Sequence, residues 1–295
     1  MASPLHVVDA PQDVRDDIRF LGPDSVSWKV AMGPTYIPAL LASLVMFELY
    51  QPMAVLGEQS VTYTDPIGRS KRSMEYFYTV VFGTKDEARK VAAHVNAMHD
   101  TIKGHWAVTG REYCASEPDN LLWLLVPVTQ LVLDAYATYG IEPLTMAERD
   151  QMWREQAVTA ELNRIPLELF PKSQAEADAY FERMRPHLGL NEASARAMRI
   201  ATYPTIWNST AVPVALVPIW RILMEAASVL LPDYAAKLVG QERPSIVRRA
   251  TIAAYKPLFA VWARTPYLCD ATAKLAGGAS YEMIRNAREL MSAGV

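Results

Sequence analysis

The sequence is short of the residue types that build several common kinds of site. Its two cysteines, Cys114 and Cys269, are too few for a disulfide scaffold and form no CxxC pair for zinc. This cysteine content indicates a reducing, cytoplasmic compartment. With only five histidines, any metal site must use few of them. The net charge is −3 at pH 7, and the sequence lacks the basic excess that a nucleic-acid partner demands.

The usual catalytic and cofactor motifs are also missing. The sequence contains no GxGxxG, GxxxxGK[ST], HExxH or GxSxG, and no CxxCH for covalent attachment of haem. The Glu-x-x-His pairs of di-iron helical bundles are absent as well. None of the enzyme classes that these motifs mark is therefore indicated.

Long uninterrupted hydrophobic runs are scarce. The most apolar stretch covers residues 36–57, but it contains Glu48 and is broken by Pro52. A membrane-spanning helix needs roughly 20 uninterrupted apolar residues, so a buried core helix is favoured over a membrane span. The first 20 residues carry acids throughout and no apolar core, so we expect neither a secretory signal nor a transmembrane segment.

Helical signals dominate what is present. Hydrophobic residues make up 51% of the chain and charged residues 21%, which is enough apolar side chain for a sizeable core. Capping boxes begin at Thr145 and Ser173, and the only strand-like run is SVTYT at residues 60–64. The signals predict helices at about 36–51, 72–82, 85–103, 118–139, 146–162, 174–186, 192–201, 214–230, 245–262 and 279–292.

These elements predict one all-α domain over residues 1–295, with an irregular N-terminal segment at 1–35. The helix at 118–139 is apolar nearly all round, so we expect it in the middle of the fold, with a kink at Pro127. Residues 203–218 are rich in proline and polar turn residues, and we interpret them as a long connection rather than a domain boundary.

His99 is the most informative histidine. Val91, Val95, Met98 and Ile102 form an apolar stripe at helical spacing, and His99 lies on that stripe. His94 is five residues earlier, so it should point away from that face. Two interpretations stay open at this point: a hydrogen-bonded core histidine, or a single axial ligand to a haem iron held among helices.

A cationic cluster lies at residues 66–73, at the start of a predicted helix. Arg69, Arg72 and Ser73 are suited to clasping haem propionates, because guanidinium binds carboxylate in a bidentate way. The alternative is a solvated charged turn. Just before it, Glu58 is either a surface residue or, if buried beside a metal, a general base with a raised pKa.

The order of these segments resembles a known family. The segments are a buried helix, GEQS, DPIGRSKRS, VVFGTKDEA, MHDTIKG and REYCASEPDNLLWLL, followed by LLP at residues 230–232. They are similar to MpaB-type oxygenases and rubber oxygenases (latex clearing proteins), whose members read close to HSDF…DPLGRLRRT…VVFG…VRxMHxxVxG…YSAxDPELLLWVH. The resemblance covers residues 46–190 and extends more weakly to about residue 276.

The resemblance implies an all-helical fold with a buried pocket for a non-covalent b-type haem. The histidine of the MH motif, here His99, is then the proximal iron ligand, and the R-x-x-x-T pair near the haem corresponds to Arg69 and Ser73. In rubber oxygenases an upstream glutamate acts as a base during cleavage of a carbon–carbon double bond. Glu58 is the nearest upstream carboxylate in this sequence.

Two departures from the family pattern affect the expected pocket. The family's WVH reads Trp123-Leu124-Leu125, and its HS pair reads Gln59-Ser60, so two histidines are lost. We expect Glu58, Gln59 and Arg69 to form the distal wall of the pocket.

The resulting hypothesis is a haem b-dependent oxygenase that uses O2 on a hydrophobic small molecule of isoprenoid or natural-product type. The alternatives are a haem-dependent dehydrogenase or rearrangement enzyme of the same fold, a non-catalytic binder of haem or an apolar ligand, and a helical interaction module without a cofactor. The sequence does not indicate an oligomeric state.

Overall fold

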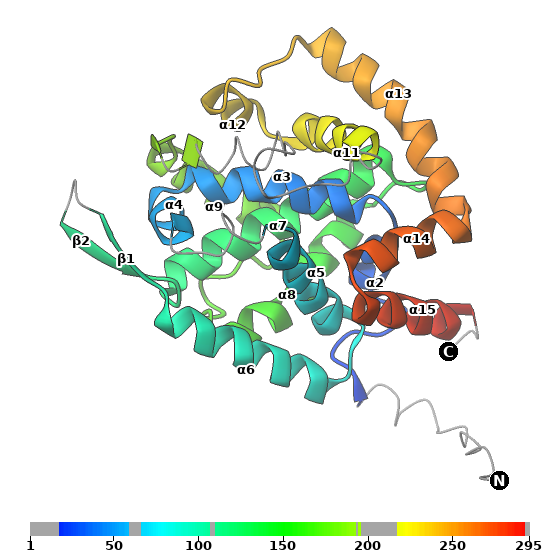
Figure 1. Cartoon of the computed structure of the whole chain (residues 1–295), viewed down its shortest axis with the longest axis horizontal. Helices are drawn as coiled ribbons and strands as arrows, with labels where there is room; N and C mark the ends of the chain where they lie inside the picture. Colours follow the sequence, from blue (N-terminus) through cyan, green and yellow to red (C-terminus); the bar gives the residue numbers. More distant parts are fainter. Residues whose placement is uncertain (1–17, 59–65, 107–109, 193, 196–216, 293–295) are drawn as a thin grey trace.

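Helices form nearly all of the regular structure, so the predicted all-α fold is confirmed (Figure 1). The computed structural model describes residues 18–58, 66–106, 110–192, 194–195 and 217–292. The elements are α2 (Val26–Ala31), α3 (Tyr36–Leu49), α4 (Gln51–Glu58), α5 (Pro66–Phe82), α6 (Lys85–Thr101), β1 (Lys103–Trp106), β2 (Arg111–Cys114), α7 (Pro118–Tyr139), α8 (Met146–Leu162), α9 (Gln174–Met184), the 3-10 turn η2 (Arg185–His187), α11 (Val217–Leu230), α12 (Asp233–Leu238), α13 (Ser245–Arg264), α14 (Pro266–Ala276) and α15 (Gly278–Ser292).

Helix α7 lies in the middle of the molecule, as its apolar composition predicts (Figure 1). It packs most extensively on α3, and the buried Trp123 donates a hydrogen bond from Nε1 to the Met46 carbonyl at 3.0 Å. Pro127 lies inside this helix. By length and composition α7 is the one described helix that could cross a membrane, but 61% of its most apolar stretch is buried among the other helices. We therefore describe it as the core helix of the fold.

Local capping signals fix the starts of several helices. The predicted box at Thr145 is formed at the start of α8, with both reciprocal hydrogen bonds to Glu148. A second complete box joins Thr84 to Glu87 at the start of α6. At the start of α9 the predicted box is only half formed, because Ser173 accepts from the Glu176 amide while the Glu176 carboxylate accepts from the Lys172 amide at 2.9 Å. Each cap satisfies backbone N–H groups that otherwise have no partner inside the helix.

Helix α2 forms within the segment that was expected to be irregular, and long-range contacts explain why. Its first amides, at Val26 and Ser27, donate to the Glu155 carboxylate of α8 at 3.0 and 2.8 Å. Its Trp28 is fully buried and donates from Nε1 to the Val81 carbonyl at 2.7 Å. A carboxylate at a helix N-terminus satisfies free N–H groups and is favoured by the helix dipole.

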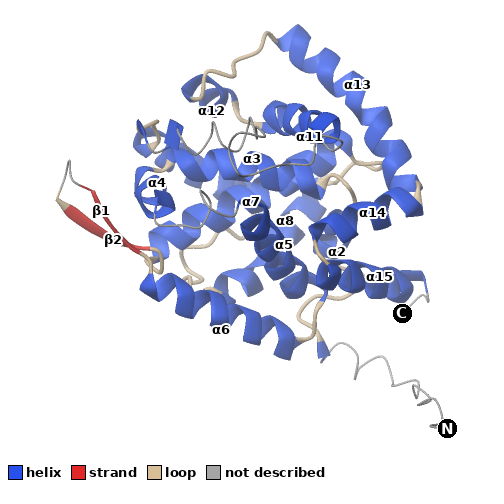
Figure 2. Ribbon diagram, viewed as in Figure 1, coloured by secondary structure: helices blue, strands red, loops and turns tan. Residues whose placement is uncertain are grey.

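Further differences from the predicted elements are the earlier start of α5 at Pro66, the helices α12 and α14, which no predicted range covers, and the ends of α3 and α6. Most of the helix predicted at 192–201 lies outside the described residues. Helix α3 ends at Leu49, and Pro52 falls in the first turn of the next helix, α4, where a missing N–H is tolerated. Helix α6 ends at Thr101, and the chain then forms the antiparallel β1–β2 hairpin, which projects from the helical body (Figure 2). The strand-like run at 60–64 and the connection at 203–216 lie outside the described residues.

Candidate functional site

The buried face of α6 carries small and polar side chains and ends at His99. Ala88, Ala92 and Asn96 are buried along this face, and His99 follows three residues later. His94 is exposed, so it lies away from that face. The expected apolar stripe is wrong in one respect, because Met98 is 46% exposed. The small side chains of Ala88 and Ala92, and not that of Met98, lie on the face of α6 that packs against the rest of the protein.

The imidazole of His99 is largely enclosed and lacks a protein partner at one nitrogen. Its Nδ1 atom is buried and forms no hydrogen bond. Burial lowers the pKa of His99 below its ordinary value of 6.5, and the positive charge of Arg69 lowers it further, whereas Asp100 raises it. His99 is therefore neutral at neutral pH, which is the form that ligates a metal.

The backbone around His99 is held from several sides. Its carbonyl oxygen accepts from the Ile102 amide at 3.2 Å and from the Cys114 Sγ at 3.7 Å. One turn earlier, Asn96 donates from Nδ2 to the Leu162 carbonyl at 2.8 Å, which ties α6 to the end of α8. These bonds orient the last turn of α6, so the direction of the His99 side chain is set by the fold.

Glu48 is a carboxyl group buried in the apolar helix α3. Its side chain is 8% exposed, and its Oε2 atom is buried without a hydrogen-bond partner. Burial raises the pKa of Glu48 to about 8, against the opposing effect of the Arg69 charge. A buried carboxyl with a pKa this close to neutrality is typical of proton-transferring groups. In the sequence, the only signal of this group is a single acid inside an apolar run, which by itself indicates only that the run is not a membrane span.

Arg69 connects these two groups electrostatically. It lies near the start of α5, half-buried, with its guanidinium carbon 5.9 Å from the centre of the Phe47 ring on α3. Its charge lowers the pKa of both Glu48 and His99, so the guanidinium lies near both groups. Three helices, α3, α5 and α6, therefore bring together one acid, one cation and one neutral imidazole.

The structure does not bring every predicted site residue into this group. Arg72 and Ser73 are exposed on α5, although Ser73 is only one helical turn from Arg69. Glu58 is the last residue of α4, and its side chain lies outside the described residues, as does the whole of Gln59. The roles expected for these four residues stay predictions.

The donor set at this site suits a haem better than a metal ion bound by protein side chains alone. Within the described part of the chain, no group of three or more His, Cys, Asp or Glu side chains could hold a metal ion. Since a porphyrin supplies the equatorial nitrogens, a haem iron needs only axial ligands from the protein. One neutral, buried imidazole with an unpartnered nitrogen fits that requirement, and Arg69 supplies a cation for a propionate.

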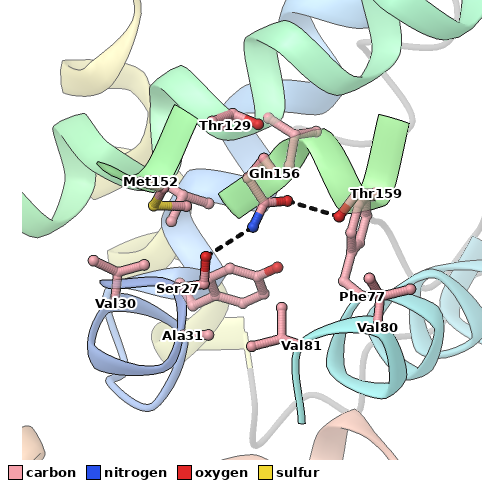
Figure 3. A pocket seen from close by; sticks show the side chains of 13 residues that line it. Ser27, Val30, Ala31, Phe77, Val80, Val81, Thr129, Met152, Gln156 and Thr159 are labelled. Carbon is pink, nitrogen blue, oxygen red and sulfur yellow. Dashed lines mark hydrogen bonds between the residues drawn. The ribbon is translucent and has the colours of Figure 1, made fainter. Parts of the chain in front are cut away.

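A separate small cavity lies between α2, α3, α5, α7 and α8 (Figure 3). Its volume is about 10 Å³, which is room for a single water-sized molecule. Three of its polar side chains are bonded to one another: Gln156 donates to Ser27 Oγ at 3.0 Å, and Thr159 donates to Gln156 at 2.9 Å. The cavity is too small for a haem or an apolar substrate, and none of Glu48, Arg69 and His99 lines it.

Comparison with known proteins assigns the chain to a family. A family model described as "ER-bound oxygenase mpaB/B'/Rubber oxygenase, catalytic domain" matches residues 28–265, which is most of the chain and includes Glu48, Arg69 and His99. No curated protein and no solved structure was found to match. The chain therefore belongs to the family of mpaB-type and rubber oxygenase catalytic domains, and its activity is of the oxygenase type.

Proposed function

We propose that this protein is a haem b-dependent oxygenase that uses O2 to oxidise a hydrophobic small molecule of isoprenoid or natural-product type. The observation that carries the proposal is the convergence of His99, Arg69 and Glu48 from three helices, within a chain of the oxygenase family. A neutral imidazole, a cation and a carboxyl with a near-neutral pKa are the groups that an axial ligand, a propionate site and a proton carrier require.

His99 is the proposed axial ligand. Its low pKa keeps the imidazole unprotonated at neutral pH, so ligation does not compete with a proton. The hydrogen bonds of Asn96 and of the His99 carbonyl fix the turn that carries it. When bound, haem supplies the iron at which O2 is activated, and the surrounding protein decides how that reactivity is used.

Arg69 has two proposed tasks. Its guanidinium binds a propionate carboxylate through paired hydrogen bonds, a geometry that a lysine cannot reproduce. Its charge also stabilises the ionised form of Glu48, which without that charge would have a still higher pKa. Arg72 and Ser73 lie on the following turn of α5, and we propose that they assist at the propionates.

Glu48 is the proposed acid–base group among the described side chains, and the role predicted for Glu58 stays a separate prediction. A carboxyl with a pKa of about 8 is mostly protonated at neutral pH and can donate its proton to an oxygen of the product, whereas its ionised fraction, which grows as the pH approaches 8, can accept a proton from a substrate carbon. The unpartnered Oε2 atom is the atom available for that proton. Its burial in an apolar helix is compatible with a substrate that is itself apolar.

The test is oxygen consumption by the haem-loaded protein with apolar alkenes, combined with ¹⁸O₂ labelling of the product. The proposal expects labelled product and a rate whose pH profile has a limb near pH 8 that is absent in Glu48→Gln. Glu75→Gln, an exposed acid on α5, is the matched control and should keep the wild-type profile. Turnover without consumption of O2 would instead support a dehydrogenase or a rearrangement enzyme of the same fold.

A further inference from the structure

The outward face of α13 is apolar, although the helix already buries its opposite face. On the inner side, Phe259 is fully buried and stacks on Tyr139, with 4.8 Å between the ring centres. On the outer side, a stripe of exposed apolar residues recurs every three or four positions, which places them on one face of the helix. Its members are Ile246, Ala250, Ala253, Pro257 and Val261.

The stripe and the residues near it in the chain are strongly exposed. Ile246 is 69% exposed and Val261 is 59% exposed, and at the start of α14 Tyr267 is 79% exposed. Val247 and Leu258 are also exposed and flank the stripe on one side. Figure 1 shows α13 along the rim of the molecule, where its outer face is open to solvent. An exposed apolar stripe along one face of a helix is typical of a binding surface on an otherwise folded protein.

The charges of α13 are all of one sign. The helix contains four cations and no acid, whereas the whole chain has a net charge of −3. Arg249 and Lys256 are exposed, and their seven-residue spacing places them on the same edge of the apolar stripe. Arg264 is exposed at the end of the helix. Neither Arg249 nor Lys256 forms an ion pair with a residue in the described part of the chain.

One acid on a neighbouring element offsets Arg248, and the other acids nearby are paired with cations outside α13. Glu225 of α11 is paired with Arg243 at 2.6 Å, and Asp233 of α12 is paired with Arg248 at 3.1 Å. Asp270 of α14 is paired with Arg288. The nearest exposed acid along the chain is Glu242, which precedes the helix. The surface around the stripe is therefore positive.

We propose that α13 and the start of α14 bind the surface of an anionic lipid bilayer. We name this surface the α13 face and define it by Ile246, Arg249, Lys256, Val261 and Tyr267. An interfacial helix of this kind inserts its apolar residues among the acyl chains near the headgroups, while its cations contact anionic headgroups. Tyr267 carries an aromatic ring with a polar tip, which suits the same boundary.

The charge pattern favours a lipid surface over a second copy of this chain. In a symmetric dimer through the α13 face, the edge that carries Arg249 and Lys256 would meet the α13 face of the second copy. Because α13 contains cations and no acid, that contact would bring positive charges together. An anionic bilayer complements both properties of the face, its apolar stripe and its positive edge.

The experiment is sedimentation of the purified full chain with vesicles of phosphatidylcholine alone and of phosphatidylcholine mixed with phosphatidylserine. We expect binding to the mixed vesicles, little binding to phosphatidylcholine alone, and loss of binding as the salt concentration rises. The double variant Arg249→Gln/Lys256→Gln should bind the mixed vesicles roughly 30-fold more weakly, because each cation near an anionic surface contributes about 1 kcal/mol.

The apolar stripe is tested by Ile246→Ser/Val261→Ser, which should weaken binding at least tenfold without altering the circular dichroism spectrum. The matched controls are Lys90→Gln and Met146→Ser, which change an exposed cation on α6 and an exposed apolar residue on α8. Absence of vesicle binding by the wild-type chain would overturn the proposal, as would equal losses in the test and control variants. A wild-type dimer that the Ile246→Ser/Val261→Ser variant converts to a monomer, without vesicle binding, would assign the face to self-association.

Discussion

Replacement of Glu48 by glutamine should remove a pH-dependent loss of stability from the cofactor-free chain. Burial raises the pKa of Glu48 from its ordinary value of 4.5 to about 8 in the folded state. The folded chain therefore binds this proton more tightly than the unfolded chain does. The stability that comes from this tighter binding of the proton is fully present at pH values below the pKa of Glu48 in the unfolded chain. It is lost as the pH rises through the pKa of Glu48 in the folded chain.

The magnitude follows from this difference in pKa. One unit of pKa corresponds to about 1.4 kcal/mol, and Glu48 is well enough buried that solvent screening reduces this little. Between about pH 6 and pH 8, the wild-type free energy of unfolding should fall by roughly 2 kcal/mol relative to the Glu48→Gln variant. The lowered pKa of His99 has the opposite effect at lower pH, because protonation of His99 reduces the free energy of unfolding there. This effect is the same in both proteins and cancels when they are compared at the same pH.

The assay is urea unfolding followed by circular dichroism at a series of pH values, on protein prepared without added haem. The comparison is valid where the slope of free energy against urea concentration is equal in both proteins. Glu161→Gln, which changes an exposed acid on α8, is the control and should track the wild type across the range. Parallel pH profiles for wild type and Glu48→Gln would refute the claim that Glu48 is protonated in the folded state near neutral pH.

Three further predictions concern the surroundings of the site. Arg69→Ala should release haem to a scavenger globin faster than Arg72→Ala, because a charged hydrogen bond contributes about 1.5–3 kcal/mol, and equal rates would demote Arg69 to a surface charge. Thr84→Ala removes the capping box of α6 and should lower the free energy of unfolding by about 1 kcal/mol, and an unchanged urea midpoint would contradict this. Asn96→Ala removes the donor to the Leu162 carbonyl and should destabilise the chain by about 1 kcal/mol, whereas a neutral effect would show that α6 is not tied to α8 at this point.

The helices were predictable where their signals are local. The capping box at Thr145 and the all-round apolar character of α7 depend only on neighbouring residues, and both elements form as expected. Helix α2 was not predictable in this way, because its N-terminal amides bind Glu155, which lies 128 residues away from Ser27 along the chain. The β1–β2 hairpin was missed because its short strands lack an alternating apolar pattern.

The sequence predicted which face of α6 carries His99, but it could not predict how deeply the site residues are buried. Helical spacing correctly distinguished the inner face of α6 from the exposed His94, yet it could not show that alanines rather than Met98 make the contact. Glu48 was not identified as a functional group because the burial of a carboxyl depends on tertiary packing, which the sequence does not show. The raised pKa of Glu48 and the unpartnered Nδ1 of His99 are properties of that packing.

The ligation of haem by His99 is tested most directly by titrating the purified chain with haemin and recording the visible spectrum. We predict a saturable Soret band in the wild type and in His94→Ala, and its loss or strong alteration in His99→Ala. Added imidazole should partly restore the band in His99→Ala by filling the vacated ligand position. A wild-type chain that develops no Soret band, or a His99→Ala variant with the wild-type spectrum and haem affinity, would contradict the proposed role of His99.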